Sequence, residues 1–214
     1  FTRFLSLYGS SPEANAARPR ILPMLVASLL ATKQPDAAIP HIRDYLARFP
    51  DGENRPDMSL WLGTALLQTG DAANARAALD DFARACPNHP QLSHAQFLAA
   101  LCAQKEGNLR EAETRFAEIA SSSNGLDSER AALMRLHCLI GLGSDADAFR
   151  LLESIRHRDP TPTCQALLAT LALTLGDRFL EKGEAAAAWR CLLFIPSRAR
   201  ILAKHEESLA RLTD

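Results

Sequence analysis

The fold is decided by a stretch that runs from residue 175 to residue 189 and reads LGDRFLEKGEAAAAW. Gly183 separates two runs of helix-forming residues, because glycine readily ends a helix at a positive φ. Gly176 and Ala188 allow a neighbouring helix to approach closely, and Phe179 supplies a large apolar anchor. The stretch therefore predicts a helix–turn–helix unit with one apolar face. Such a unit needs similar units beside it to bury that face.

Copies of this unit recur along the chain. An alanine of the second helix returns at spacings of 37, 37, 36 and 40 residues, as Ala38, Ala75, Ala112, Ala148 and Ala188. A glycine stands five residues before four of these alanines, as Gly70, Gly107, Gly143 and Gly183, while the first unit has Lys33 there. Twelve residues after three of the alanines stands a proline, which cannot continue a helix. These prolines are Pro50, Pro87 and Pro160, after Ala38, Ala75 and Ala148. A period of this length with two helices per unit predicts an all-α solenoid.

The order of residues within each unit resembles the tetratricopeptide repeat. This family has Leu-Gly in the first helix, Gly at the turn, Ala in the second helix and Pro at the end. The second and fifth units match best, with Leu62-Gly63 and Leu175-Gly176, whereas the third has Ala99-Ala100 there. The fourth has Arg135-Leu136, so its first helix must pack differently. The resemblance implies a right-handed superhelix of about five repeats with a C-terminal capping helix.

We expect three regions along the chain. Residues 1–18 form an irregular or linker segment, and residues 197–214 form the capping helix, with apolar positions at Ile201, Leu202, His205, Leu209 and Leu212. Between them lie five repeats, over 19–55, 56–92, 93–128, 129–161 and 162–196. The first helix is expected to begin at about Pro19, since Pro19 and Pro23 are tolerated best near a first turn.

Composition agrees with closely packed helices and excludes some classes of function. The chain is 47% hydrophobic but 6% aromatic, as alanine-rich helices are. Its 24 basic and 25 acidic residues give a net charge of −1, which argues against a nucleic-acid partner. The longest apolar run, residues 21–31, is broken by Pro23 and is shorter than the roughly 20 residues that cross a bilayer.

The five cysteines show no metal or redox spacing. They are an odd number without a CxxC pair, and Cys102 and Cys138 occupy equivalent positions in neighbouring units. We therefore expect buried, free thiols that fill the core. Free thiols favour a reducing compartment.

No catalytic motif stands out in the sequence. GxSxG, the P-loop, GxGxxG and HExxH are all absent, and His205-Glu206-Glu207 lacks a second histidine four residues on. We expect a protein that is not an enzyme, with no catalytic residue, cofactor or metal.

The family resemblance implies that the first helix of each repeat lines a concave groove. The matching positions are Leu60, Thr64, His94, Phe97, Leu101, Arg130, Leu133, His137, Leu173 and Asp177. The apolar stripe Leu60–Phe97–Leu133–Leu173 suits an amphipathic helix or an extended peptide, but these side chains could instead pack first helix on first helix. The Lys, Arg and Asn set with which some family members bind an acidic C-terminus is missing here.

The favoured hypothesis is a protein–protein interaction scaffold that binds a peptide or helix of a partner. The alternatives are a self-associating structural segment of a larger protein and a regulatory helical domain that positions an enzyme encoded in the flanking sequence. Residues 45–50 (YLARFP), followed by Leu60-Trp61-Leu62-Gly63, resemble repeats of bacterial envelope assembly proteins. That resemblance implies a periplasmic or membrane-associated location through an upstream anchor. The cell envelope is therefore the favoured location, and the free cysteines keep the cytoplasm as the alternative.

Overall fold

The computed structural model describes residues 12–122, 126–155 and 161–194. All regular structure in these ranges is α-helical, which confirms the predicted all-α fold. The chain divides into two compact units, residues 1–107 and residues 108–214.

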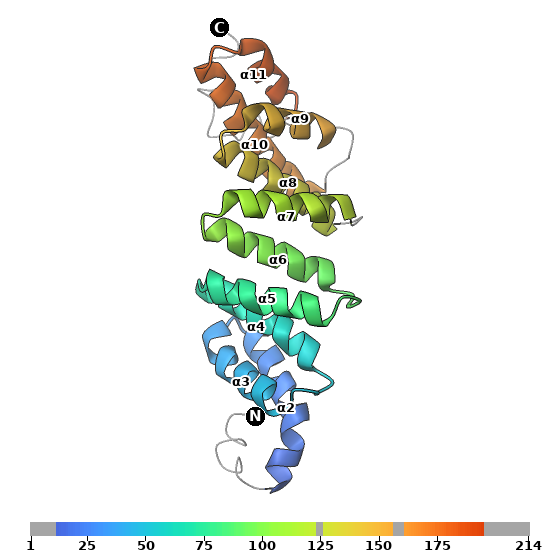
Figure 1. Cartoon of the computed structure of the whole chain (residues 1–214). Coiled ribbons are helices and arrows are strands. Elements are labelled where there is room, and N and C mark those ends of the chain that lie inside the picture. The colour runs from blue at the N-terminus through green and yellow to red at the C-terminus, as the bar shows by residue number, and fades with distance from the viewer. Residues whose placement is uncertain (1–11, 123–125, 156–160, 195–214) are drawn as a thin grey trace. The chain divides into compact units, whose positions relative to one another are not determined.

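The first unit is built from helices that each pack on the next along the chain, and α4 also contacts α6. In Figure 1 they run from blue to green. Their bounds are α2 (Pro12–Ala31), α3 (Pro35–Arg48), α4 (Arg55–Thr69), α5 (Ala72–Ala85) and α6 (Leu92–Lys105). Within this unit, α2–α3 and α4–α5 are the first and second helix pairs expected from the repeats.

The second unit continues the alternation of first and second helices. α7 packs on α8, α8 packs on α9, and α10 contacts α8, α9 and α11. The bounds are α7 (Leu109–Ser122), α8 (Leu126–Gly141), α9 (Asp145–Ile155), α10 (Pro162–Glu181) and α11 (Ala185–Leu192).

The turns between paired helices use the residues that the repeat pattern singled out. Gly70, Gly107, Gly143 and Gly183 have φ values of 93°, 83°, 76° and 76°. Lys33, at the corresponding position of the first repeat, adopts the same left-handed conformation with a φ of 57°. A side chain costs free energy in this conformation, so the first turn is strained where the other four are not.

Apolar clusters form the core of the first unit in its described residues. One joins α2, α3 and α4 around Tyr45, and another joins α4, α5 and α6 around Leu79 and Phe82. α4 and α5 meet closely at Gly63, where an added Cβ would lie 2.4 Å from Leu79 Cγ. Glycine is therefore required at this predicted point of close approach.

In the described part of the second unit, an apolar cluster around Leu136, Leu152 and Phe179 joins α8 to α11. Gly176 of α10 faces α11, where an added Cβ would lie 3.4 Å from Cys191 Cβ. This is an ordinary contact distance, so α10 and α11 approach less closely here than α4 and α5 do at Gly63.

One expected helix boundary is wrong. α2 begins at Pro12 instead of about Pro19, and both Pro19 and Pro23 lie inside it. Burial of Leu22, Leu25 and Val26, all less than 7% exposed, stabilises the helix despite the backbone hydrogen bonds that proline removes. The proposed capping helix over 197–214 lies outside the described residues.

Candidate functional site

The apolar stripe expected on the first helices is buried. Leu60 is 3%, Phe97 7%, Leu133 1% and Leu173 5% exposed. Leu60 belongs to the core cluster of α4, α5 and α6, and Leu133 to that of α8 to α11. These four side chains therefore offer little surface to a partner.

The remaining predicted residues are more accessible and fall in both units. In the first unit, Thr64, His94 and Leu101 are half-buried, and Thr64 Oγ1 donates a hydrogen bond to the Leu60 carbonyl at 2.9 Å. In the second, Arg130 and Asp177 are half-buried. His137 is exposed on α8. Since α4 contacts α6 and α8 contacts α10, each unit brings its own members together from neighbouring first helices.

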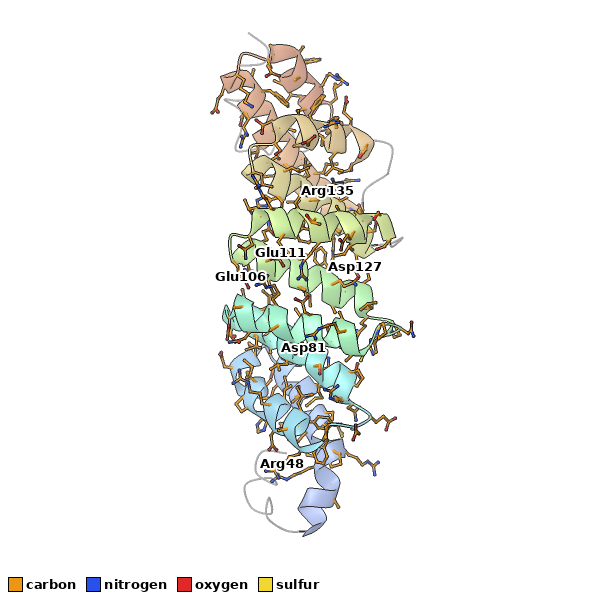
Figure 2. The ribbon with its side chains drawn as sticks, viewed as in Figure 1. Arg48, Asp81, Glu106, Glu111, Asp127 and Arg135 are labelled. Carbon is orange, nitrogen blue, oxygen red and sulfur yellow. The ribbon has the colours of Figure 1, made fainter. Side chains whose placement is uncertain are left out.

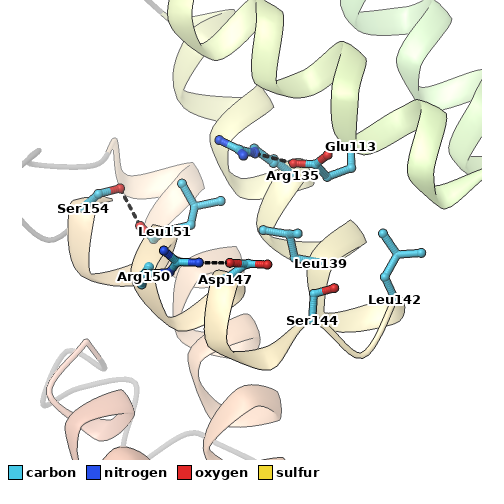
Figure 3. A pocket seen from close by; sticks show the side chains of 9 residues that line it. All are labelled: Glu113, Arg135, Leu139, Leu142, Ser144, Asp147, Arg150, Leu151 and Ser154. Carbon is cyan, nitrogen blue, oxygen red and sulfur yellow. Dashed lines mark hydrogen bonds and ion pairs between the residues drawn. The ribbon is translucent and has the colours of Figure 1, made fainter.

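A separate groove opens in the second unit, with a volume of about 650 Å³. It lies between α7, α8, the turn after α8 and α9, as Figure 3 shows. We call it the α7–α9 groove. Its lining consists of Glu113, Arg135, Leu139, Leu142, Ser144, Asp147, Arg150, Leu151 and Ser154.

Charges of both signs lie along the α7–α9 groove. Arg135 Nε lies 2.7 Å from Glu113 Oε1 and joins α8 to α7, and Arg150 pairs with Asp147 on α9 (Figure 3). Ser154 Oγ donates to the Leu151 carbonyl at 2.7 Å. The groove thus combines two arginine–carboxylate pairs, which are partly open to solvent, with a few apolar side chains such as Leu142 and Leu151. A surface of this kind suits a mixed-charge peptide better than an apolar one.

The first unit has an equivalent but smaller groove of about 300 Å³ between α3, α4 and α5. Gly143 follows Gly70 by 73 residues, and five lining positions of the two grooves are related by the same interval. They are Leu62 and Arg135, Leu66 and Leu139, Asn74 and Asp147, Ala78 and Leu151, and Asp81 and Ser154. The repeat geometry therefore creates this groove, and the side chains decide its chemistry.

Arg135 adds a charged side chain to the α7–α9 groove where the groove of the first unit has an apolar one. It occupies the position of Leu62, an apolar residue that packs against the core of the first unit. The Arg135 side chain is 35% exposed and turns to Glu113. The departure of Arg135-Leu136 from the Leu-Gly pattern is the sequence feature that could have indicated the different chemistry of this groove, but the sequence did not show which helix Arg135 would face.

An ion cluster holds α9 against α10 beside the groove. Asp145, 3% exposed at the start of α9, accepts a hydrogen bond from Lys182 Nζ at 2.7 Å. Arg178 Nε lies 2.9 Å from the other carboxylate oxygen, and Arg178 Nη1 donates to the Ile140 carbonyl at 2.8 Å. These contacts tie the turn of one repeat to the first helix of the next, so they help to fix the position of α9 in the groove.

The buried cysteines are poor nucleophiles. Burial raises the pKa of the Cys102 and Cys138 thiols to about 11 and that of Cys191 to about 12. Reactive cysteines need a lowered pKa and access to solvent, so these three residues fill the core. Within the described ranges, no group of three or more His, Cys, Asp or Glu side chains could hold a metal ion.

Residues 24–90 match the family model described as Tetratricopeptide repeat. The structure is similar to MamA, from residue 41 to its end, of Desulfovibrio magneticus RS-1, with a TM-score of 0.68 and 15% identity over 89% of this chain and 97% of that one. It is also similar to a putative kinesin light chain of Podosopora anserina with nearly identical TPR-like repeats. Here the TM-score is 0.64 and the identity 15%, over 88% of this chain and 98% of that one. The chain has the tetratricopeptide-repeat fold.

Curated proteins gave no match by sequence. The structural likenesses, at 15% identity, establish the solenoid fold of tetratricopeptide repeats, and a fold does not by itself determine function. Among the described helices, none has the length and apolar character needed to span a membrane.

Proposed function

We propose that this tetratricopeptide-repeat chain is a non-enzymatic scaffold that binds a peptide or helix of a partner protein. The observation that carries the proposal is the α7–α9 groove, which is large enough to take several side chains. Repeats of this kind present extended surfaces assembled from equivalent positions of successive units. Peptide recognition in such a groove needs no catalytic group.

The α7–α9 groove supports the proposal better than the buried apolar stripe does. A partner segment that entered it would find the half-buried Leu142 and Leu151 beside exposed charges on Asp147 and Arg150. Apolar contacts supply affinity, while the charges favour one register and one partner sequence. A partner would thus gain apolar burial without any rearrangement of the core.

A second candidate binding surface has accessible side chains. Arg130, His137 and Asp177 lie on the first helices of the second unit, flanking the buried Leu133 and Leu173. Contact there would be mainly polar. Both surfaces fit a protein partner, and they can be separated by experiment.

The test compares wild type with two double variants. The first, Arg150→Glu/Ser154→Arg, changes exposed groove residues; the second, His137→Glu/Asp177→Lys, changes the face of the first helices. Proteins retained by each bait from lysate of the source cell are identified by mass spectrometry, and the partner is then titrated in purified form. Circular dichroism confirms that each variant keeps its helical content.

The proposal predicts one saturable partner whose affinity falls at least about tenfold in the groove variant, a loss of about 1.4 kcal/mol of binding free energy. The first-helix variant should bind as wild type does. Loss in that variant alone would move the site to the face of the first helices. Absence of any saturable partner for wild type would overturn the scaffold proposal in favour of a structural or self-associating segment.

A further inference from the structure

The groove between α3, α4 and α5 in the first unit, which we call the α3–α5 groove, carries two arginines without a carboxylate partner. Arg43 comes from α3 and Arg55 from the start of α4, and both side chains are exposed. In the described part of the chain, neither guanidinium makes an ion pair or a hydrogen bond. The half-buried hydroxyl of Ser59, which also lines the groove, has no hydrogen-bond partner among these residues either. Three hydrogen-bond donors are therefore open in one groove.

The carboxylates nearest to the α3–α5 groove are bound by other residues. Asp81, labelled in Figure 2, lines the groove and pairs with Arg84. Asp71, at the start of α5, accepts hydrogen bonds from Asn74 Nδ2 at 2.7 Å and from the Asn74 backbone N–H at 3.3 Å. These bonds are the main cause of the lowered pKa of Asp71, and the charge of Arg43 contributes less. Arg43 is therefore close enough to act on Asp71 through its charge, but it is not bound by it.

Unpaired arginines are uncommon among the described residues of the first unit. Arg18 and Arg48 both contact Asp44, and Arg76 contacts Glu106. Most arginines of this unit thus meet a carboxylate on a neighbouring turn or helix. The exceptions include two that share one groove.

The second unit has neither of these cations at the corresponding positions. Counted from the repeat alanine of the second helix, Arg43 corresponds to Ala117 of α7. Counted from the Leu-Gly position of the first helix, Arg55 corresponds to Ser128 of α8. Ser128 is buried and donates a hydrogen bond to the Ala120 carbonyl at 3.0 Å. The two arginines are therefore a property of the α3–α5 groove and not of the repeat geometry.

Apolar side chains lie beside the two arginines. Leu46 of α3 and Leu62 of α4 are half-buried in the lining of the groove. The groove volume of about 300 Å³ is at the lower end of the range for ligand pockets, so it suits a few side chains of a partner segment. An arginine guanidinium presents parallel N–H donors that match the two oxygens of a carboxylate.

We propose that the α3–α5 groove binds an acidic segment of a partner protein, in which Glu or Asp side chains stand next to an apolar one. The carboxylates contact Arg43 and Arg55, the Ser59 hydroxyl is a further donor, and the apolar side chain packs on Leu46 and Leu62. Charge complementarity selects such a segment over a basic or a neutral one. The proposal does not depend on the proposed function, because this groove shares no residue with the α7–α9 groove or with the predicted face of the first helices.

Labelled peptides test the proposal on the full chain. Three fluorescein-labelled peptides share one frame of serine and leucine and differ only in carrying glutamate, glutamine or lysine. Their binding is measured by fluorescence anisotropy. The groove variant, Arg43→Ala/Arg55→Ser, introduces the residues that the second unit has at these positions. The matched control, Arg20→Ala/Arg110→Ser, removes two exposed arginines outside both grooves by the same substitutions.

Wild type should bind the glutamate peptide saturably and prefer it to the other two. The groove variant should bind the glutamate peptide at least about tenfold more weakly, a loss of about 1.4 kcal/mol, while the control should bind as wild type does. Amide chemical shifts should change along the lining of α3, α4 and α5 during the titration. The charge reversal Arg43→Glu/Arg55→Glu should transfer the preference to the lysine peptide, a gain of binding that an unfolded variant could not give.

Four results would overturn the proposal. Wild type might show no saturable binding of the glutamate peptide, or it might bind the glutamine peptide equally well. An equal loss in the groove variant and the control would assign the binding to the general positive charge of the surface. Chemical-shift changes confined to α7, α8 and α9 would move the acidic segment to the α7–α9 groove.

Discussion

Two glycines that the repeat pattern treats as equivalent have different physical roles. Gly63 is pressed against the Leu79 side chain, whereas Gly176 has ordinary contact distances around it. We predict that Gly63→Ala lowers the free energy of unfolding by about 1–3 kcal/mol through overpacking. Gly176→Ala should be neutral or stabilising by up to about 1 kcal/mol, because alanine is the better helix former. Urea denaturation of the two variants tests this, and equal losses would contradict the distances.

Lys33 adopts a strained backbone conformation at the turn where the other four repeats have glycine. Because its φ is 57°, we predict that Lys33→Gly raises the free energy of unfolding by about 1 kcal/mol. The reverse change, Gly107→Ala, should cost a similar amount, since an added Cβ there has no atom within 4 Å and backbone conformation alone matters. Thermal denaturation measures both variants. A destabilising Lys33→Gly would show that the lysine side chain contributes a contact that outweighs the strain.

At the scale of helices, the buried Asp145 is a polar link between repeats in the second unit, through Arg178 and Lys182 of α10. We predict that Asp145→Asn, which leaves Arg178 and Lys182 without their carboxylate, lowers the free energy of unfolding by about 2–3 kcal/mol. Asp147→Asn is the matched control, because its side chain is 53% exposed and its pair with Arg150 is worth less than about 1 kcal/mol. Chemical denaturation compares the two. If both variants lost a similarly small amount of unfolding free energy, the contacts of Asp145 with Arg178 and Lys182 would contribute little to stability.

We predict that three buried thiols make the free energy of unfolding depend on pH in the alkaline range. In the folded chain the pKa values of Cys102 and Cys138 are about 11 and that of Cys191 about 12, whereas an unfolded cysteine ionises near 8.5. The folded state therefore holds more protons above about pH 8.5, and the free energy of unfolding should fall as the pH rises from there towards about 11–12. Replacing all three by alanine should flatten this decline when urea denaturation is measured at each pH. An unchanged slope would contradict the burial of these thiols.

At the scale of the whole chain, sequence spacing predicted the helices well because the turn glycines mark them. Gly70, Gly107, Gly143 and Gly183 all adopt the expected positive φ. The start of α2 was missed because the burial of Leu22 and Val26 outweighs the local preference of proline. Propensity describes a segment in isolation, and such tertiary burial does not appear in it.

The candidate site was less predictable than the fold. Helical spacing places Leu60 and Phe97 at equivalent positions, but it cannot distinguish a groove from a core, and the structure buries both. The α7–α9 groove depends on contacts such as Arg135 with Glu113, which lie 22 residues apart. Two residues so far apart in the sequence cannot be recognised as a pair from the sequence alone. The unusual Arg135 indicates only that the fourth repeat differs from the others.

The most direct test of the scaffold account is site-specific photo-crosslinking. A photoreactive phenylalanine analogue is placed at Ser154 in the α7–α9 groove, and separately at His137 on the face of the first helices; both positions are exposed. A partner protein should be cross-linked from Ser154, and unlabelled wild-type chain should compete for it. Cross-linking from His137 alone, or no competed product from either position, would contradict the claim that the groove receives a partner.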